Sequence, residues 1–153
     1  MRLAWPDLVI EHISPDDFGA WILEWAGLIE GRIAPAFMNK FGVWFLRRAE
    51  GPVEMLDVFS GTVERVAESY EEFVCNVNDP SWQEAYLLSP LVFTLHEAGK
   101  IPGDYQCYAV ALHPVMGGPN PMAGELVEPR FVTVMDIPVW QSLCAQFVGR
   151  GRA

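Results

Sequence analysis

The sequence predicts an α+β fold, with an antiparallel sheet of about five strands and helices packed on one face of the sheet and at its ends. Three observations lead to this prediction. Apolar residues recur at helical spacing over 15–27, strand-like runs separated by short turns fill 43–67, and several Ser-Pro or Asp-Pro pairs open helices. Short turns between such runs are typical of an antiparallel meander against which helices pack.

The size and composition of the chain indicate one compact domain. It has 153 residues, of which 51% are hydrophobic and 20% charged, which excludes an intrinsically disordered protein. We expect a single domain over 1–153, with an ordered core at 15–148 and a frayed tail at 149–153 that has two arginines and no apolar anchor.

The first helix is predicted near 15–27. Ser14 can cap it, Pro15 suits its first turn, and Asp17 stands at the capping-box position. The segment 30–42 contains two glycines and a proline and is expected to be irregular.

Strands are then predicted at 43–48, 53–59 and 62–67, where apolar and β-branched residues lie between turn residues. Within the second strand, Asp57 alternates with apolar neighbours and is expected to point inward, where it must find hydrogen-bond partners. This pattern favours a structural role for Asp57 over a catalytic one.

Three cap signals predict the helices that follow. Ser69 with Glu72 forms a capping box for a helix at 70–77, and Asp79 precedes a proline that opens the next one. A second Ser-Pro pair at 89–90 predicts a break or kink, and Gly99 is a natural residue to end that helix.

The last third of the sequence predicts two strands, at 106–112 and 130–135, and a final helix after Asp136. Between the strands, 113–129 is rich in Gly and Pro and is expected to form a long ordered loop or flap. Met116-Gly117-Gly118-Pro119 lacks the frame of a phosphate-binding loop, so a turn that needs positive φ explains these glycines better.

Charge is distributed unevenly along the chain. Twenty Asp and Glu against ten Lys and Arg give a net charge of −10, which argues against binding to nucleic acid or to an anionic membrane. Residues 50–97 hold ten of the acids and a single base, Arg65. Such a segment either steers a basic partner or is a solvated surface that keeps the protein soluble. The candidate partner-binding residues are Glu54, Glu64, Glu68, Glu71, Glu72, Asp79 and Glu84.

No motif specifies an enzyme, a cofactor or a metal site. The three histidines are not at metal-ligand spacing, the three cysteines form no Cys-x-x-Cys pair, and no Ser or Cys nucleophile has a recognisable motif. We expect no catalytic residue, no cofactor and no metal, and buried reduced thiols in a cytoplasmic protein. The N-terminus lacks the apolar stretch of a signal peptide, and no window is long enough for a membrane span.

Several short motifs, in this order and spacing, resemble a known bacterial family. They are Phe41-Gly42-Val43-Trp44-Phe45, Ser69-Tyr70-Glu71-Glu72-Phe73, Leu95-His96-Glu97-Ala98-Gly99, Pro102-Gly103-Asp104-Tyr105-Gln106-Cys107-Tyr108 and Pro114-Val115-Met116-Gly117-Gly118. The resemblance, over about 21–147, is to the family that includes the C-terminal domain of type VI secretion immunity proteins, whose members often carry a GAD-like N-terminal portion. This chain has Cys144 and Asp136 where the family often has histidine, so no histidine role carries over.

The resemblance implies a cytoplasmic immunity protein, not an enzyme, that binds and blocks a cognate toxin, which is a DNase in characterised relatives. A nuclease presents a basic surface to its substrate, and an acidic protein can occupy it. The acidic binding residues are inferred from charge alone. The alternative is a small-molecule-binding or hydrolytic protein with a pocket under 113–129, using Tyr108 and His113. The six Trp and nine Phe provide enough aromatic surface for a homodimer interface. The sequence does not indicate which face of the protein would form it.

Overall fold

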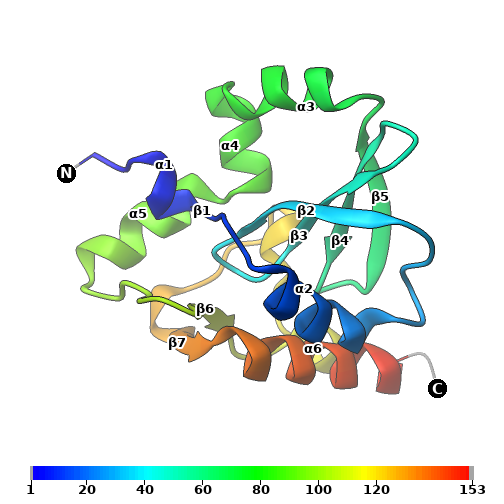
Figure 1. Cartoon of the computed structure of the whole chain (residues 1–153). Helices are drawn as coiled ribbons and strands as arrows, with labels where there is room; N and C mark the ends of the chain where they lie inside the picture. Colours follow the sequence, from blue (N-terminus) through cyan, green and yellow to red (C-terminus); the bar gives the residue numbers. More distant parts are fainter. Residues whose placement is uncertain (1, 152–153) are drawn as a thin grey trace.

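The computed structural model describes residues 2–151 and confirms the α+β class (Figure 1). Five antiparallel strands in chain order form the main sheet, and two more form a separate antiparallel pair. The main sheet consists of β1 (Val9–Ile10), β2 (Ile33–Asn39), β3 (Trp44–Arg48), β4 (Val53–Asp57) and β5 (Thr62–Ala67). The pair consists of β6 (Gln106–Val110) and β7 (Val132–Asp136).

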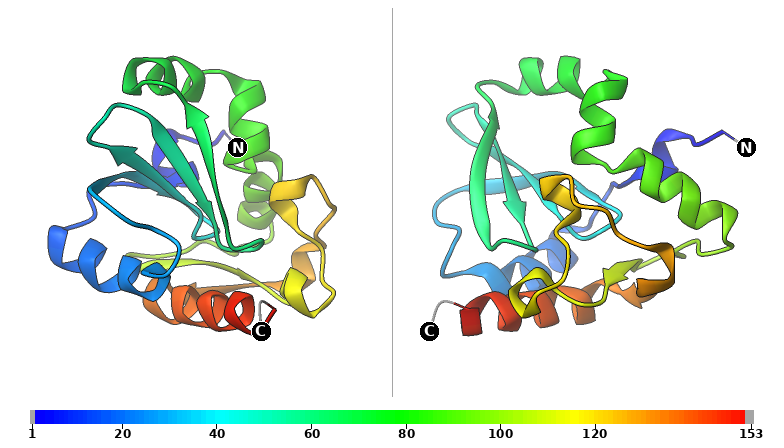
Figure 2. Two further views of the ribbon diagram at one scale, coloured as in Figure 1. Left: turned by 90° about the vertical axis from the view of Figure 1, so that its right-hand side faces the viewer. Right: turned by 180° about the vertical axis from the view of Figure 1, so that it is seen from behind.

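Helices surround the main sheet, with α3 and α4 on one side and α2 and α6 on the other (Figures 1 and 2). The α-helices are α1 (Trp5–Leu8), α2 (Pro15–Ile22), α3 (Tyr70–Val77), α4 (Pro80–Tyr86), α5 (Ser89–Glu97) and α6 (Ile137–Gly151). Four 3₁₀ turns are described as well: η1 (Leu23–Trp25), η2 (Pro114–Met116), η3 (Pro121–Ala123) and η4 (Pro129–Phe131). Within residues 2–151, no helix combines the length and the apolar character needed to span a bilayer.

The prediction that 30–42 is irregular was wrong, because β2 runs through most of it. Proline lacks the N–H that a central strand needs, yet Pro35 lies within β2. The short strand β1 pairs only with Met38 and Asn39, so it leaves β2 unpaired on that side at Pro35. The register with β3 also shifts just after Pro35. The two predicted strands near the C-terminus, in turn, form the separate pair instead of joining the main sheet.

The predicted helix starts are confirmed. Ser14, Ser69 and Asp79 each accept a hydrogen bond from a backbone N–H in the first turn of the following helix. The expected break before Pro90 is also present, because Leu88 adopts φ +57° between α4 and α5.

The predicted ends of the helices are confirmed in part. Gly99 follows α5 at φ +80°, as expected of a residue that ends a helix. The first helix is shorter than predicted, since α2 gives way to η1 at Leu23. At the other end of the chain, α6 continues to Gly151 and includes the first three residues of the expected tail. Residues 152–153 of that tail lie outside the described residues.

Aromatic side chains join the helices to both faces of the main sheet. Phe45 on β3 packs against Phe73 of α3 and Trp82 of α4, with ring centroids 6.0 Å and 5.5 Å away. The preceding residue, Trp44, points to the opposite face and packs 5.5 Å from Phe18 of α2. The core therefore extends through the sheet, and α2 and α6 lie on the face that Trp44 covers.

A buried amide ties α6 to this second face. Gln141 is fully buried, and its Oε1 accepts hydrogen bonds from the indole Nε1 of Trp25 at 2.7 Å and of Trp44 at 2.9 Å. Its Nε2 donates to the carbonyl oxygen of Gly42 at 2.8 Å. Gly42 has φ +86°, and a Cβ there would lie 2.9 Å from the Gln141 amide nitrogen. Glycine is therefore required at this turn both by its backbone angle and by the close approach of α6.

We expect Gln141→Met to destabilise the protein by about 2–5 kcal/mol, because it leaves two indole N–H groups and a carbonyl buried without partners. Chemical denaturation measures the free energy of unfolding. Gln146→Met, an exposed substitution on the same helix, is the matched control and is expected to change it by less than about 0.5 kcal/mol. Equal losses in the two variants would contradict this role of Gln141.

Candidate functional site

Four of the predicted acidic residues lie together where β5 leads into α3. Glu64 is on β5, Glu68 is in the connection, and Glu71 and Glu72 are in the first turn of α3; all four are exposed. The Glu72 carboxylate accepts a hydrogen bond from the backbone N–H of Glu68 at 3.1 Å. We call these four residues the acidic patch. Glu68 also forms an ion pair with Arg65 at 3.1 Å, and both side chains are mostly exposed.

The other three predicted residues have local roles of their own. Glu54 forms a half-buried ion pair with Arg48 across β4 and β3 at 2.5 Å. Asp79 caps α4 through the backbone N–H of Ser81 at 2.9 Å. Glu84, on α4, lines a groove that is described below. Glu54 and Asp79 are therefore occupied by contacts within the fold, unlike most of the acidic patch.

Apolar side chains are exposed on the helix that carries the patch. Tyr70 and Val74 are one turn apart on α3 and are 39% and 41% exposed. The guanidinium of Arg47 lies 3.6 Å from the centre of the Tyr70 ring. The neighbouring strand β5 is the last strand of the main sheet. Exposed aromatic and apolar groups rimmed by charge are typical of surfaces that bind another protein.

Asp57 is structural, as the sequence predicted. It is 6% exposed, and its carboxylate accepts hydrogen bonds from the backbone N–H of Phe59 at 2.9 Å and the hydroxyl of Ser60 at 3.0 Å. Burial raises the pKa of Asp57, and these hydrogen bonds counteract part of that rise. The carboxylate thus closes the turn between β4 and β5.

His113 is fully engaged with the backbone. It is 2% exposed, and its Nδ1 accepts a hydrogen bond from the N–H of Val115 at 3.2 Å. Nε2 therefore carries the proton and donates to the carbonyl oxygen of Val58 at 3.0 Å. Burial lowers the pKa of His113, although this hydrogen bond favours the charged form. With both nitrogens occupied, the ring anchors the start of the 113–129 loop and is not placed to act as a general base.

Tyr108 is likewise buried, and its hydroxyl donates to the carbonyl oxygen of Lys100. Burial raises the pKa of Tyr108 to about 12.

A groove of about 390 Å³ does lie beside the second half of the 113–129 loop, but neither Tyr108 nor His113 lines it. The groove is lined by Glu84, Leu88, Pro90, Leu91, Thr94, Pro121, Gly124, Glu125, Leu126, Val127 and Pro129.

The adjacent glycines Gly117 and Gly118 are each required for a different reason. Gly117 adopts φ +96°, as the sequence predicted for a turn. Gly118 instead allows a close approach, because a Cβ there would lie 1.8 Å from the carbonyl oxygen of Leu112. No sequence signal distinguishes these two reasons.

The cysteines fit the prediction only in part. Cys107 and Cys144 are buried, and burial raises the pKa of both thiols. Cys75, on α3, is exposed, which the sequence analysis did not anticipate. In the described part of the chain, no three His, Cys, Asp or Glu side chains are grouped so that they could hold a metal ion.

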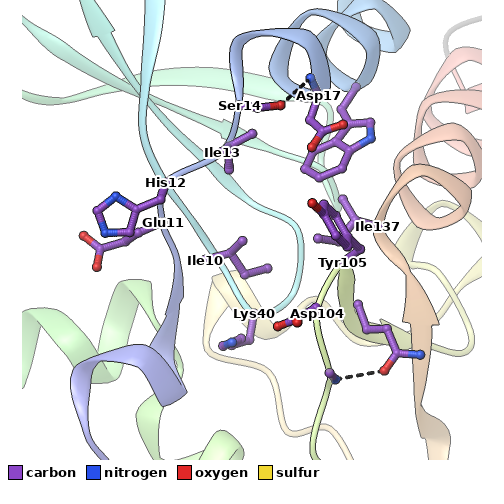
Figure 3. Close-up of a pocket in the computed structure, with 13 residues that line it drawn as sticks. Ile10, Glu11, His12, Ile13, Ser14, Asp17, Lys40, Asp104, Tyr105 and Ile137 are labelled. Atoms are coloured by element: carbon purple, nitrogen blue, oxygen red, sulfur yellow. Dashed lines mark hydrogen bonds between the residues drawn. The ribbon is translucent and has the colours of Figure 1, made fainter.

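Sequence reasoning missed a second hollow, of about 350 Å³, between the N-terminal segment and the turn that precedes β6 (Figure 3). Its residues come from 10–21, Lys40, 103–106 and Ile137. The sequence analysis gave none of these segments a binding role: 103–106 belongs to a motif of the family resemblance, and Ser14 and Asp17 belong to a helix cap. The cavity becomes visible only when the fold brings the segments together.

Neither the protein-family models nor the curated proteins that were compared with the chain match it. The acidic patch combines exposed carboxylates with exposed apolar side chains beside them. Its groups suit electrostatic and apolar contact with a basic surface.

We expect the stability of the protein to fall as the pH is lowered through and below about 6.5, the ordinary pKa of histidine, because His113 is held neutral in the folded state. The unfolded chain binds the proton first, so stability is complete above this pH and decreases toward the lower pKa of the folded protein. The variant His113→Gln should lose the part of this pH dependence that comes from His113. The measurement is the free energy of unfolding at about pH 7.5 and about pH 5 for both proteins.

The raised pKa of Asp57 has the opposite effect, because it makes the folded protein relatively more stable as the pH falls. Asp57 is present in both proteins, so its contribution largely cancels when the pH dependence of the variant is subtracted from that of the wild type. The same dependence on pH in the wild type and in His113→Gln would contradict a neutral buried His113.

Proposed function

We propose that this protein is an immunity protein that binds a cognate secreted toxin with a basic surface and neutralises it stoichiometrically. A nuclease of the kind that the resemblance implies would present such a surface to its nucleic-acid substrate. The protein itself transforms no substrate in this proposal. The toxin would meet the acidic patch and the apolar side chains beside it.

The observation that carries this proposal is the concentration of exposed carboxylates at one junction. The acidic patch places four of them within nine residues of chain, and Arg65 is the single base in that stretch. A second cation, Arg47, lies over the ring of Tyr70, so acids still outnumber bases at this junction. Within residues 2–151, contacts inside the fold engage only two of the four side chains: Glu72 accepts a hydrogen bond from the backbone N–H of Glu68, and Glu68 pairs with Arg65, while the side chains of Glu64 and Glu71 make no hydrogen bond or ion pair. A field of one sign on the surface raises the rate at which an oppositely charged protein associates.

The apolar groups beside the acidic patch would supply binding affinity, whereas the charges would mainly raise the association rate. Charged residues at the rim of an interface mainly set the association rate, whereas buried aromatic groups account for most of the affinity. Tyr70 and Val74 are exposed on the same helix as Glu71 and Glu72. Contact with a partner would bury this pair, and the carboxylates would direct the approach.

We expect the variant Glu64→Gln, Glu68→Gln, Glu71→Gln and Glu72→Gln to associate with the toxin about ten-fold more slowly at low salt. Glutamine keeps the side-chain oxygen that caps the backbone at Glu72, so the fold should be unchanged. The probe is the purified product of the gene adjacent to this one, as the candidate toxin, and stopped-flow mixing measures the rate. The difference from the wild type should shrink as salt screens the charges.

The matched control removes four exposed acids elsewhere, through Asp16→Asn, Glu24→Gln, Glu50→Gln and Glu97→Gln. Its net charge equals that of the patch variant, so it separates a local surface from overall charge. If both variants associate equally slowly, or if the patch variant protects cells expressing the toxin as well as wild type and binds as fast, the acidic patch is not the binding surface.

A second candidate is a small-molecule-binding protein that uses the groove beside the 113–129 loop. One observation favours it: the groove is mostly apolar, and Leu126 at its wall is 87% exposed. Apolar hollows of roughly 300 Å³ and above are typical ligand sites. A hydrolytic version is not supported by His113, because its ring nitrogens are bound to the backbone.

For this candidate we expect a panel of short aliphatic and aromatic alcohols to include compounds that raise the melting temperature, since a ligand that binds only the folded state stabilises it. Thr94→Tyr places a ring in the groove and should abolish the shift, whereas Thr133→Tyr, exposed on β7, should leave it unchanged. A panel without any shift, or equal shifts in the two variants, would rule out this use of the groove.

A further inference from the structure

The cavity of Figure 3 has charged groups at its two ends and apolar walls between them. Asp17 lies at one end, and Lys40 and Asp104 lie next to each other at the opposite end. Ile10 and Ile13 form one side, and Tyr105 faces them. This arrangement differs from the groove beside α5, whose lining is mostly apolar.

No direct contact with a described residue engages any of the three ionic groups. Over residues 2–151, neither the Lys40 ammonium nor the Asp17 and Asp104 carboxylates form a hydrogen bond or an ion pair. Lys40 and Asp17 are nevertheless half-buried. Burial lowers the pKa of Lys40, while Asp7 and Asp104 favour its charge from a greater distance than an ion pair. Asp104 is exposed, and all three charged groups are free to contact a ligand that enters the cavity.

The backbone around the cavity is also strained. Of the three non-glycine residues with positive φ in the described chain, two line this cavity: His12 at +58° and Tyr105 at +62°. Such angles persist where the surrounding structure enforces them, and they concentrate at binding sites. Here the carbonyl oxygen of Tyr105 accepts a hydrogen bond from the N–H of Ile137 at 2.9 Å, which fixes the turn against α6.

We propose that this cavity binds a free basic α-amino acid, arginine or lysine. The ligand's carboxylate would meet Lys40, its α-ammonium would meet Asp104, and its side-chain cation would meet Asp17. The apolar stem would lie between Ile13 and Tyr105. A volume of about 350 Å³ accommodates a molecule of this size.

Charge selects this ligand class over its neighbours. Two carboxylates and one ammonium give the three converging groups a net charge of −1, and arginine or lysine has a net charge of +1. A neutral amino acid would leave Asp17 without a partner, and a simple carboxylic acid would meet repulsion from Asp104. The side chains of Glu11 and His12 point away from the other labelled residues and are not needed for this match.

Aromatic groups can add to recognition of the side-chain cation. Trp21 and Tyr105 both line the cavity, and their rings pack edge to face with centroids 6.4 Å apart. A guanidinium or ammonium near such rings gains a favourable cation–π contact. None of these residues belongs to the acidic patch, so the inference is independent of the proposed toxin binding.

Isothermal titration of the full chain tests the site with four probes. L-arginine and L-lysine are expected to bind. Agmatine, which is arginine without its carboxylate, and norleucine, which is lysine without its ε-ammonium, are each expected to bind about ten-fold or more weakly, because each loses one charge-assisted contact. Absence of heat from arginine and lysine up to about 10 mM, well above a millimolar Kd, would overturn the proposal.

Two variants assign the contacts. Asp17→Asn should weaken arginine binding about ten-fold, whereas its neighbour Asp16→Asn, in the same first turn of α2 but outside the cavity, should not. Lys40→Met should abolish the preference for arginine over agmatine. If this variant does not fold, as judged by circular dichroism, the agmatine comparison in wild type tests the same contact. If the Asp17 and Asp16 variants bind arginine equally well, the cavity does not recognise the side-chain cation through Asp17. If arginine and agmatine bind equally well, the cavity does not recognise the carboxylate of the ligand.

Discussion

The buried amide of Gln141 connects parts of the molecule that the chain separates widely. It joins α6 to η1, to β3 and to the turn after β2 through two indole N–H groups and one carbonyl. All of these partners are buried or close to the core, where a polar group without a partner is expensive. The position of α6 is therefore fixed by a polar constraint in addition to apolar packing. The nearby cavity depends on it, because Ile137 at the start of α6 holds the Tyr105 turn.

Other buried polar side chains organise the loops in the same way. Asn39 accepts hydrogen bonds from the N–H groups of Phe41 and Val43 and donates to the carbonyl oxygen of Tyr86. Asp57 closes the β4–β5 turn, and His113 attaches the long loop to it through the carbonyl oxygen of Val58. Residues whose chemistry would suit a reaction are thus occupied in holding backbone groups. The acidic patch, the groove and the cavity are, in contrast, open at the surface.

The acidic patch and the cavity could be predicted from the sequence to very different degrees. Glu64, Glu68, Glu71 and Glu72 are near one another in the chain, so a turn between a strand and a capped helix keeps them together in space. Glu54 and Asp79 also lie in the acidic segment, but an ion pair with Arg48 and a helix cap occupy them. The cavity residues extend from Ile10 to Ile137 in the chain, and a sequence pattern does not show that such distant segments lie side by side.

The sequence by itself determined the fold class, most helix starts and the strands at 43–67, because caps, turn residues and periodicity act over a few neighbouring residues. Only the tertiary structure decided which strands share a sheet, since pairing depends on contacts between distant segments. The segment around Pro35 forms a strand because β1 does not extend beside Pro35, so no strand on that side needs a hydrogen bond from the proline. The tertiary structure also placed Tyr108 and His113 in the core, where desolvation and backbone hydrogen bonds, absent from any linear motif, set their roles.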